Sequence, residues 1–167
     1  MKILVTTASK HGATAEIGDA IAGKLREHDL AVEVHEPGDV ASLDGYDAVI
    51  LGSAVYAGRW MDTARRFSEH HHEALRRLPV WLFSSGPIGD PLEPSEESVD
   101  GHRLLGELEA REHRTFPGRV HSSELGWVER TITKMVKAPD GDFRDFDAIR
   151  IWAAGIADQL APATAAR

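Results

Sequence analysis

Cysteine is absent from this chain of 167 residues. Disulfides, thiolate metal sites, iron–sulfur clusters and a cysteine nucleophile are therefore excluded, and any redox chemistry requires a bound cofactor. Long apolar runs are also lacking. No stretch approaches the roughly 18 to 20 apolar residues of a membrane span, and the apolar run within residues 1–6 is too short for a signal peptide. We therefore expect a cytoplasmic protein.

Positive charge is in the minority, with 19 Lys and Arg residues against 27 Asp and Glu residues and a formal net charge of -8. Proteins that bind a phosphate backbone usually present a net positive face, so we expect no nucleic-acid partner. The Walker A motif and the G-x-G-x-x-G dinucleotide fingerprint are both missing. The G-x-S-x-G elbow is missing as well, which argues against a hydrolase.

Apolar runs and helical spacings alternate along the chain. Short apolar segments that end in small polar loops predict strands, and apolar residues spaced by three or four predict helices. The expected strands are residues 2–6, 31–35, 48–51 and 80–83, with a polar fifth strand over 119–123 at the sheet edge. The expected helices are residues 13–28, 61–78, one containing 104–108, 125–137 and 146–160. This alternation favours one α/β domain, residues 1–162, with a parallel sheet, and a loose tail at 163–167.

The loop after the first strand is rich in small and polar residues. Ligands of such sheets bind at the carboxyl ends of the strands. A phosphate placed at the start of the following helix would meet unpaired amides and the positive end of the helix dipole. Ser9 and Thr14 could add hydroxyl donors, and Gly12 allows close approach of the backbone. The alternative is that Ser9 and Thr14 only cap the helix.

The loop after the third strand, residues 53–60, combines small residues with Tyr56 and Trp60. A flat heterocycle requires apolar or aromatic faces and backbone amides along its polar edge, and this loop offers both. Residues 84–89 could close over the other side of a ring. The alternative is that the two aromatic residues belong to the core or cover the surface. Arg59 is expected to be a solvated charge rather than a partner of an anionic substrate.

The segments 7–14 and 52–58 together resemble the corresponding loops of the flavodoxin family. Within it, the chain is most similar to the menaquinone-dependent protoporphyrinogen oxidase group, and the likeness extends to residues 141–146. The resemblance implies a flavodoxin-like three-layer sandwich, whose five-stranded parallel sheet has the order 2-1-3-4-5 and helices on both faces. It also implies FMN, with its phosphate on the first loop and its ring between the other two. The cofactor-binding residues that it implies are Ser9, Lys10, His11, Gly12, Ala13, Thr14, Ser53, Ala54, Val55, Tyr56, Ala57, Gly58, Ser85, Gly86 and Pro87.

The same resemblance implies an FMN-dependent oxidoreductase that works with a quinone or another redox partner. Residues 90–111 and 124–138 exceed what a minimal carrier needs, which favours an enzyme. In the oxidase group the second of these segments is longer, more aromatic and more basic, which weighs against porphyrinogen as a substrate here. Two alternatives stay open: a simple flavodoxin-type electron carrier, and a cofactor-free binding or regulatory module.

Two further patterns invite functional interpretations. His70, His71 and His72 are consecutive, and neighbouring helix residues point about 100° apart, so they cannot chelate one metal together. We expect no metal site, and we place His71 on the apolar helix face. The predicted helix 125–137 carries an apolar stripe beside basic residues. We expect it to pack on the sheet, and peripheral contact with a membrane or partner is the alternative.

Overall fold

The computed structural model describes residues 1–86, 98–120 and 141–161. Within these ranges, five parallel strands form the main sheet in the order β2-β1-β3-β5-β6, which confirms the predicted order. A short strand pairs antiparallel with the end of β3. The strands of this sheet are β1 (Lys2–Ala8), β2 (Ala31–His35), β3 (Ala48–Tyr56), β4 (Arg59–Trp60), β5 (Val80–Ser85) and β6 (Glu112–Phe116).

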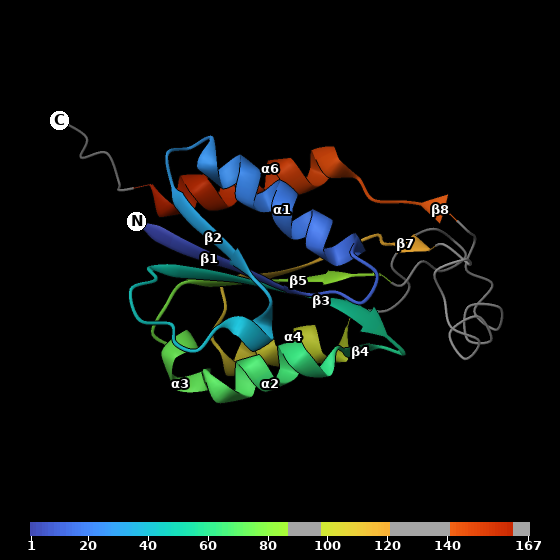
Figure 1. Ribbon diagram of the computed structural model, residues 1–167, viewed down its shortest axis with the longest axis horizontal. Helices are drawn as coiled ribbons and strands as arrows, with labels where there is room; N and C mark the ends of the chain where they lie inside the picture. Colours follow the sequence, from blue (N-terminus) through green and yellow to red (C-terminus); the bar gives the residue numbers. More distant parts are fainter. Residues whose placement is uncertain (87–97, 121–140, 162–167) are drawn as a thin grey trace.

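Helices cover both faces of the sheet, as predicted. The long helices α1 (Ala13–Arg26) and α6 (Phe146–Leu160) lie together on one face (Figure 1). The opposite face carries the helices α2 (Asp62–His70), α3 (His72–Leu75) and α4 (Val99–Glu107), and a 3-10 turn, η1 (Pro37–Asp39), follows β2. The predicted helix 125–137 and the predicted tail 163–167 lie outside the described residues.

The helix predicted over residues 61–78 is interrupted. His71 leaves the helical conformation with φ -99° and ψ 14°, and α2 ends there. Its buried ring lies with Nε2 3.2 Å from the carbonyl oxygen of Val40. The ring centre lies 4.8 Å from that of Phe67, so His71 is buried on the apolar side as predicted, although it is not part of the helix. Among the described residues, no three His, Asp or Glu side chains gather as metal ligands would.

The position predicted for the fifth strand was wrong. The edge strand of the main sheet is β6, whereas Arg119–Val120 forms β7, which pairs antiparallel with β8 (Gly141–Asp142). Residues 121–123 lie outside the described ranges. An edge strand is covered on fewer sides and needs few apolar residues. The polar sequence of β6 therefore did not identify it as a strand. Backbone pairing with β5 decides the position of β6.

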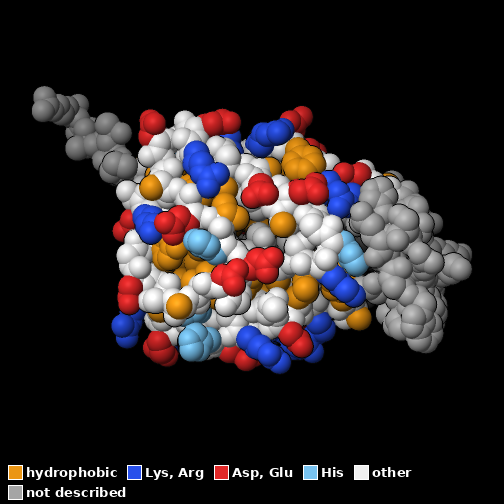
Figure 2. Space-filling view, in the orientation of Figure 1, with side chains coloured by type: hydrophobic (Ala, Val, Ile, Leu, Met, Phe, Trp, Pro, Cys, Tyr) orange, Lys and Arg blue, Asp and Glu red, His pale blue; other side chains and the backbone are white. Residues whose placement is uncertain are grey.

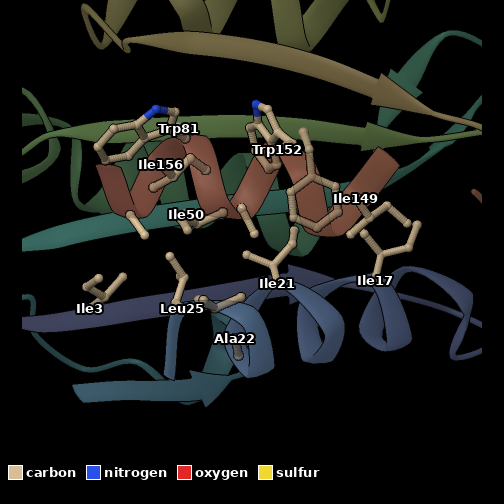
Figure 3. Packing of buried hydrophobic residues seen from close by; sticks show 14 of the residues in the cluster. Ile3, Ile17, Ile21, Ala22, Leu25, Ile50, Trp81, Ile149, Trp152 and Ile156 are labelled. Carbon is tan, nitrogen blue, oxygen red and sulfur yellow. The ribbon is translucent and has the colours of Figure 1, made fainter. Parts of the chain in front are cut away.

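The core above the sheet is built from the apolar faces of α1 and α6. Ile17, Ile21 and Leu25 recur every four residues on α1 and are fully buried. Figure 3 shows them facing Ile149, Trp152 and Ile156 of α6 across the side chains that rise from the strands. The ring of Trp152 meets those of Phe83 and Phe116 edge-on, with centroids 6.2 and 5.5 Å apart. The predicted apolar stripes of both helices are therefore confirmed.

The side chains of β1, β3 and β5 alternate between two apolar layers because successive strand residues point to opposite faces. Leu4, Leu51 and Leu82 join the second layer, against α2, α3 and α4. The strands are thus buried on both faces. No helix among the described residues is both long and apolar enough to cross a membrane. On the face shown in Figure 2, acidic and basic side chains are interspersed rather than gathered by sign.

The outer strand β2 carries a polar contact that a titration can test. Tyr46 donates a hydrogen bond of 2.5 Å from its hydroxyl to Glu33 Oε2, and Lys2 Nζ lies 3.0 Å from Glu33 Oε1. The bond from Tyr46, followed by that from Lys2, lowers the pKa of Glu33 from 4.5 to about 2. Burial and then the bond to Glu33 raise the pKa of Tyr46 from 10.0 to about 12.

Tyr46→Phe is expected to raise the pKa of Glu33 toward 4.5, because the largest cause of its depression is removed. A carboxyl with a depressed folded-state pKa stabilises the fold above its unfolded-state pKa, and that contribution is lost as the pH falls from about 4.5 to about 2. Carbon-13 titration of the carboxyl by NMR measures the shift. Tyr56→Phe is the matched control and should leave Glu33 unchanged. An unmoved Glu33 in Tyr46→Phe would contradict the expectation.

Candidate functional site

The loops that end β1, β3 and β5 lie at one edge of the sheet. The parallel register places Ala8 beside Ser53, and Ser53 beside Ser84, so the three loops begin side by side. At this edge, on the right in Figure 1, β4, β7 and β8 also lie. Lys10 Nζ lies 5.9 Å from the centre of the Tyr56 ring, which joins the first loop to the second. The described parts of the three predicted loops therefore lie beside one another.

The first loop exposes the amino end of α1. Gly12 occupies the N-cap position with φ 81° and ψ -18°, a left-handed conformation that favours glycine. The first backbone bond of the helix runs from Glu16 N–H to the Gly12 carbonyl, at 3.0 Å. The amides before Glu16 consequently have no partner within the helix. Gly12 itself is the N-cap residue, and no side chain makes a capping hydrogen bond to these amides. Neither Ser9 nor Thr14 is therefore the capping residue. Thr14 is buried and Ser9 is half-buried.

The second loop is the tight turn of a hairpin between β3 and β4. Val55 pairs with Trp60 and Tyr56 with Arg59, which leaves Ala57 and Gly58 as the two turn residues. Both have positive φ, 49° and 74°, as a type I′ turn requires. The two aromatic residues of this loop have different environments. Trp60 is 2% exposed and belongs to the core, whereas Tyr56 is 39% exposed at the sheet edge.

Asp100 of α4 holds this hairpin through hydrogen bonds to its second strand, β4. Its carboxylate is fully buried, and Oδ2 accepts hydrogen bonds of 2.9 Å from both Arg59 Nε and the Trp60 amide. Burial alone would raise the pKa of Asp100, but the bonds from Arg59 and Trp60 outweigh it and hold the pKa below 3.8. The expectation that Arg59 is simply solvated was therefore wrong. Its half-exposed side chain carries the counter-charge of a buried carboxylate.

The hydroxyls of Ser53 and Ser84 make hydrogen bonds within the protein at this site. Ser53 donates to the Ala54 carbonyl at 2.8 Å and accepts from the Met61 amide at 3.0 Å. Ser84 accepts from Trp60 Nε1 at 2.8 Å, and its Oγ lies 2.8 Å from His113 Nε2. These bonds connect the strand ends to the hairpin and to β6. They hold the second loop beside the third.

The third loop begins at Ser85, which is buried, and Gly86. The Gly86 amide donates to the Phe116 carbonyl at 3.0 Å, and Gly86 has φ 77°. Gly118 lies so close that a side chain there would approach the Gly86 backbone within 3.3 Å. Pro87 lies outside the described residues. The start of this loop is therefore held against the end of β6.

Sequence reasoning missed two groups of residues at this site. Asp100 looks like an ordinary acidic residue in the first turn of a helix. Arg119 and Arg144 contact the back of the first loop: Arg119 Nη2 donates to the His11 carbonyl at 3.0 Å, and Arg144 Nη1 to the Ala13 carbonyl at 3.2 Å. The resemblance of residues 141–146 to a known group was a signal for Arg144, but it gave that residue no role.

Comparison with known families identifies this arrangement. A profile of the Flavodoxin domain family matches residues 4–147. This chain belongs to the flavodoxin domain family. The match runs from the first buried strand to the start of α6, so it includes all three loops.

Individual relatives of this flavodoxin domain are distant. Protoporphyrinogen IX dehydrogenase (quinone) of Escherichia coli strain K12 is 20% identical over 151 residues, which cover 87% of this chain and 83% of that protein. Among solved structures, a flavodoxin from the domain Archaea has a TM-score of 0.67 at 15% identity, covering 96% of this chain and 99% of that one. Flavodoxin 1 from Bacillus cereus has a TM-score of 0.63 at 19% identity, covering 96% and 100%. These structures support the fold.

The flavodoxin domain and its neighbours imply FMN as the cofactor. The edge described above fits such a molecule. A single phosphate needs convergent amide donors, and the amino end of α1 offers them without a capping side chain. A flat ring needs accessible backbone and an aromatic neighbour, which the Ala57-Gly58 turn and the exposed Tyr56 provide. The chain is therefore an FMN-binding, flavodoxin-like protein.

Proposed function

We propose that this protein is an FMN-dependent oxidoreductase that passes electrons to a quinone in the cytoplasm. The observation that carries the proposal is the convergence of three loops at the carboxyl edge of the sheet, where the uncapped amino end of α1 meets the β3–β4 hairpin. The choice of FMN as the cofactor rests on the flavodoxin relationship. The choice of a quinone as the electron acceptor rests on the name of the Escherichia coli relative.

The phosphate of FMN would be held by the first loop. In this proposal the amides around Gly12 bind it, with the hydroxyls of Ser9 and Thr14 as further donors. The isoalloxazine ring would lie between the second and third loops, against Tyr56. The full set of proposed contacts is residues 9–14, 53–58 and 85–87.

Bound FMN supplies the chemistry of accepting and returning one or two electrons. The contribution of the chain is to bind and orient it. In this proposal the turn amides of Ala57 and Gly58 would donate along the polar edge of the ring, and Tyr56 would shield one face from water. Lys10 lies beside Tyr56 and places a positive charge at this edge. That charge would stabilise the negative charge that a flavin ring gains when it is reduced.

Binding of FMN is the first test of the proposal. Titration of the purified protein should quench flavin fluorescence, and FMN should bind at least about tenfold more tightly than riboflavin because the phosphate adds charge-assisted hydrogen bonds. Ser9→Ala should weaken FMN binding and leave riboflavin binding unchanged. Thr63→Ala removes an exposed hydroxyl on α2 and serves as the matched control. A protein without flavin bands, and without binding on titration, would instead support the cofactor-free module.

Turnover separates an enzyme from an electron carrier. With a reductant supplied in excess, an enzyme should reduce a menaquinone analogue at a rate that saturates with the concentration of the analogue. A simple carrier is re-reduced as well, but its rate should rise linearly with that concentration because it has no quinone site. Adding protoporphyrinogen tests that substrate directly. Residues 124–138, on which the argument against porphyrinogen rests, lie outside the described residues, as does the segment 125–137 for which peripheral membrane contact was the alternative.

A further inference from the structure

Two arginines from the end of the chain reach the back of the first loop. Arg119 stands on β7 and Arg144 follows β8, and these two strands pair with each other beside the amino end of α1 (Figure 1). The side chain of Arg144 is 3% exposed and that of Arg119 is 17% exposed. They are therefore enclosed within the protein rather than extended into solvent.

Each arginine holds a carbonyl oxygen of the loop. Arg119 donates to the His11 carbonyl and Arg144 to the Ala13 carbonyl, at 3.0 and 3.2 Å. A trans peptide is planar, and its N–H points away from its C=O. Holding the His11 carbonyl therefore turns the Gly12 amide to the opposite side, toward the proposed phosphate. The contact with Ala13 reinforces the direction that the first turn of α1 already gives the Thr14 amide.

The carboxylates of Glu16 and Asp142 fix the arginines in place. Glu16 Oε1 lies 3.1 Å from Arg119 Nη1, and Glu16 Oε2 lies 2.7 Å from Arg144 Nη1. Arg144 also binds both oxygens of Asp142, through Nε at 2.8 Å and Nη2 at 2.6 Å. Among the residues that the structure describes, the two guanidinium groups thus lie against two carboxylates. This balance argues for orientation of the loop rather than for attraction of an anion by net charge.

We infer that Arg119 and Arg144, joined through Glu16, are positioning residues that aim the loop amides at the phosphate of FMN. This inference rests on the proposed function. The arginines touch the peptide groups from behind and do not themselves bind the phosphate. None of these residues belongs to the set that sequence reasoning assigned to the cofactor.

Arg144→Lys tests the inference because lysine keeps the charge but cannot make four directed contacts from one planar group. FMN affinity should fall about tenfold, corresponding to one or two lost hydrogen bonds, while riboflavin affinity changes little. In the ligand-free protein, the NMR resonances of the Gly12 and Thr14 amides should shift and their order parameters should fall, because the loop loses an anchor. Arg150→Gln removes an exposed arginine of α6 that pairs only loosely, at 3.5 Å, with Asp147, and it is the matched control.

Glu16→Gln distinguishes orientation from charge. Removing a negative charge near a bound phosphate would tighten FMN binding if net charge governed affinity. If Glu16 positions the arginines, FMN binding should weaken, by about threefold or more, because a glutamine amide presents a donor to a guanidinium. Glu16 is half-exposed, so this variant also serves if Arg144→Lys fails to fold.

The outcomes separate the two proposals. Equal or tighter FMN binding by Glu16→Gln, or an unchanged preference for FMN over riboflavin in Arg144→Lys, would overturn the inference while FMN binding by the unaltered protein stands. If the unaltered protein binds no FMN, the proposed function fails and this inference fails with it. Unchanged amide resonances and order parameters at Gly12 and Thr14 in both variants would overturn it without reference to flavin.

Discussion

Gly52→Ala is expected to lower the free energy of unfolding by about 2 to 3 kcal/mol. A methyl group at this position would lie 2.1 Å from Cζ and 2.3 Å from Cε1 of Phe83, far inside contact distance. Gly52 and Phe83 are opposite each other in the β3–β5 register. The Phe83 ring is fully buried and packs edge-on against Phe116 and Trp152, so it has no space into which to move.

A double-mutant cycle with Phe83→Leu checks this explanation. A smaller side chain at Phe83 makes room for the methyl group, so Gly52→Ala should cost less than about 1 kcal/mol in that background, and the pair should show a clear coupling energy. Denaturant unfolding of the four proteins measures it. Gly155→Ala on α6 is the matched glycine control because a methyl group there meets nothing within 4 Å. It should stabilise by about 0.5 to 1 kcal/mol. Equal costs of Gly52→Ala in both backgrounds would refute the steric explanation.

Asp100→Ala is expected to destabilise the protein by about 2 to 3 kcal/mol. The substitution leaves the buried amide of Trp60 without its acceptor and removes the partner of Arg59. The ion pair itself contributes only modestly because the Arg59 side chain is 54% exposed and can be solvated. The larger part of the loss therefore comes from the orphaned amide and from the loosened hairpin.

Asp100→Ala should weaken FMN binding as well as lower the stability of the protein. The hairpin that Asp100 anchors carries the turn at Ala57 and Gly58, so amide exchange in that turn should accelerate and FMN binding should weaken. Asp100→Asn retains an acceptor for the Trp60 amide, and it should recover part of the loss. Asp19→Ala, on an exposed position of α1, is the control and should change stability by less than about 0.5 kcal/mol. A hairpin whose exchange is unaffected by Asp100→Ala would show that other contacts hold it.

Local patterns were sufficient to predict the frame of this protein. The strands β1, β3 and β5 are buried on both faces, so their apolar runs identify them, and α1 and α6 each carry an apolar stripe at helical spacing. Small polar residues follow the same three strands. Since parallel strands end at a common edge, the convergence of those loops follows from the order of elements.

Contacts between distant segments decided the rest. The polar strand β6 is defined by backbone pairing with β5, to which its side chains give no clue. The sequence does not distinguish the environments of Tyr56 and Trp60, since both are aromatic residues of the same loop. Packing of the hairpin on α4 buries Trp60 and leaves Tyr56 exposed. Arg59 and Asp100 are 41 residues apart, and the fold alone makes them partners.

The amino-acid sequence by itself determined the buried strands, the two amphipathic helices of the upper layer and the loops that a cofactor would meet, because each depends on a short repeating pattern. Only the tertiary structure decided how the site is held. Arg144 reaches Glu16 across 128 residues of sequence. Such a polar contact stabilises only when folding brings both groups together and removes water from them, and no local pattern records that event.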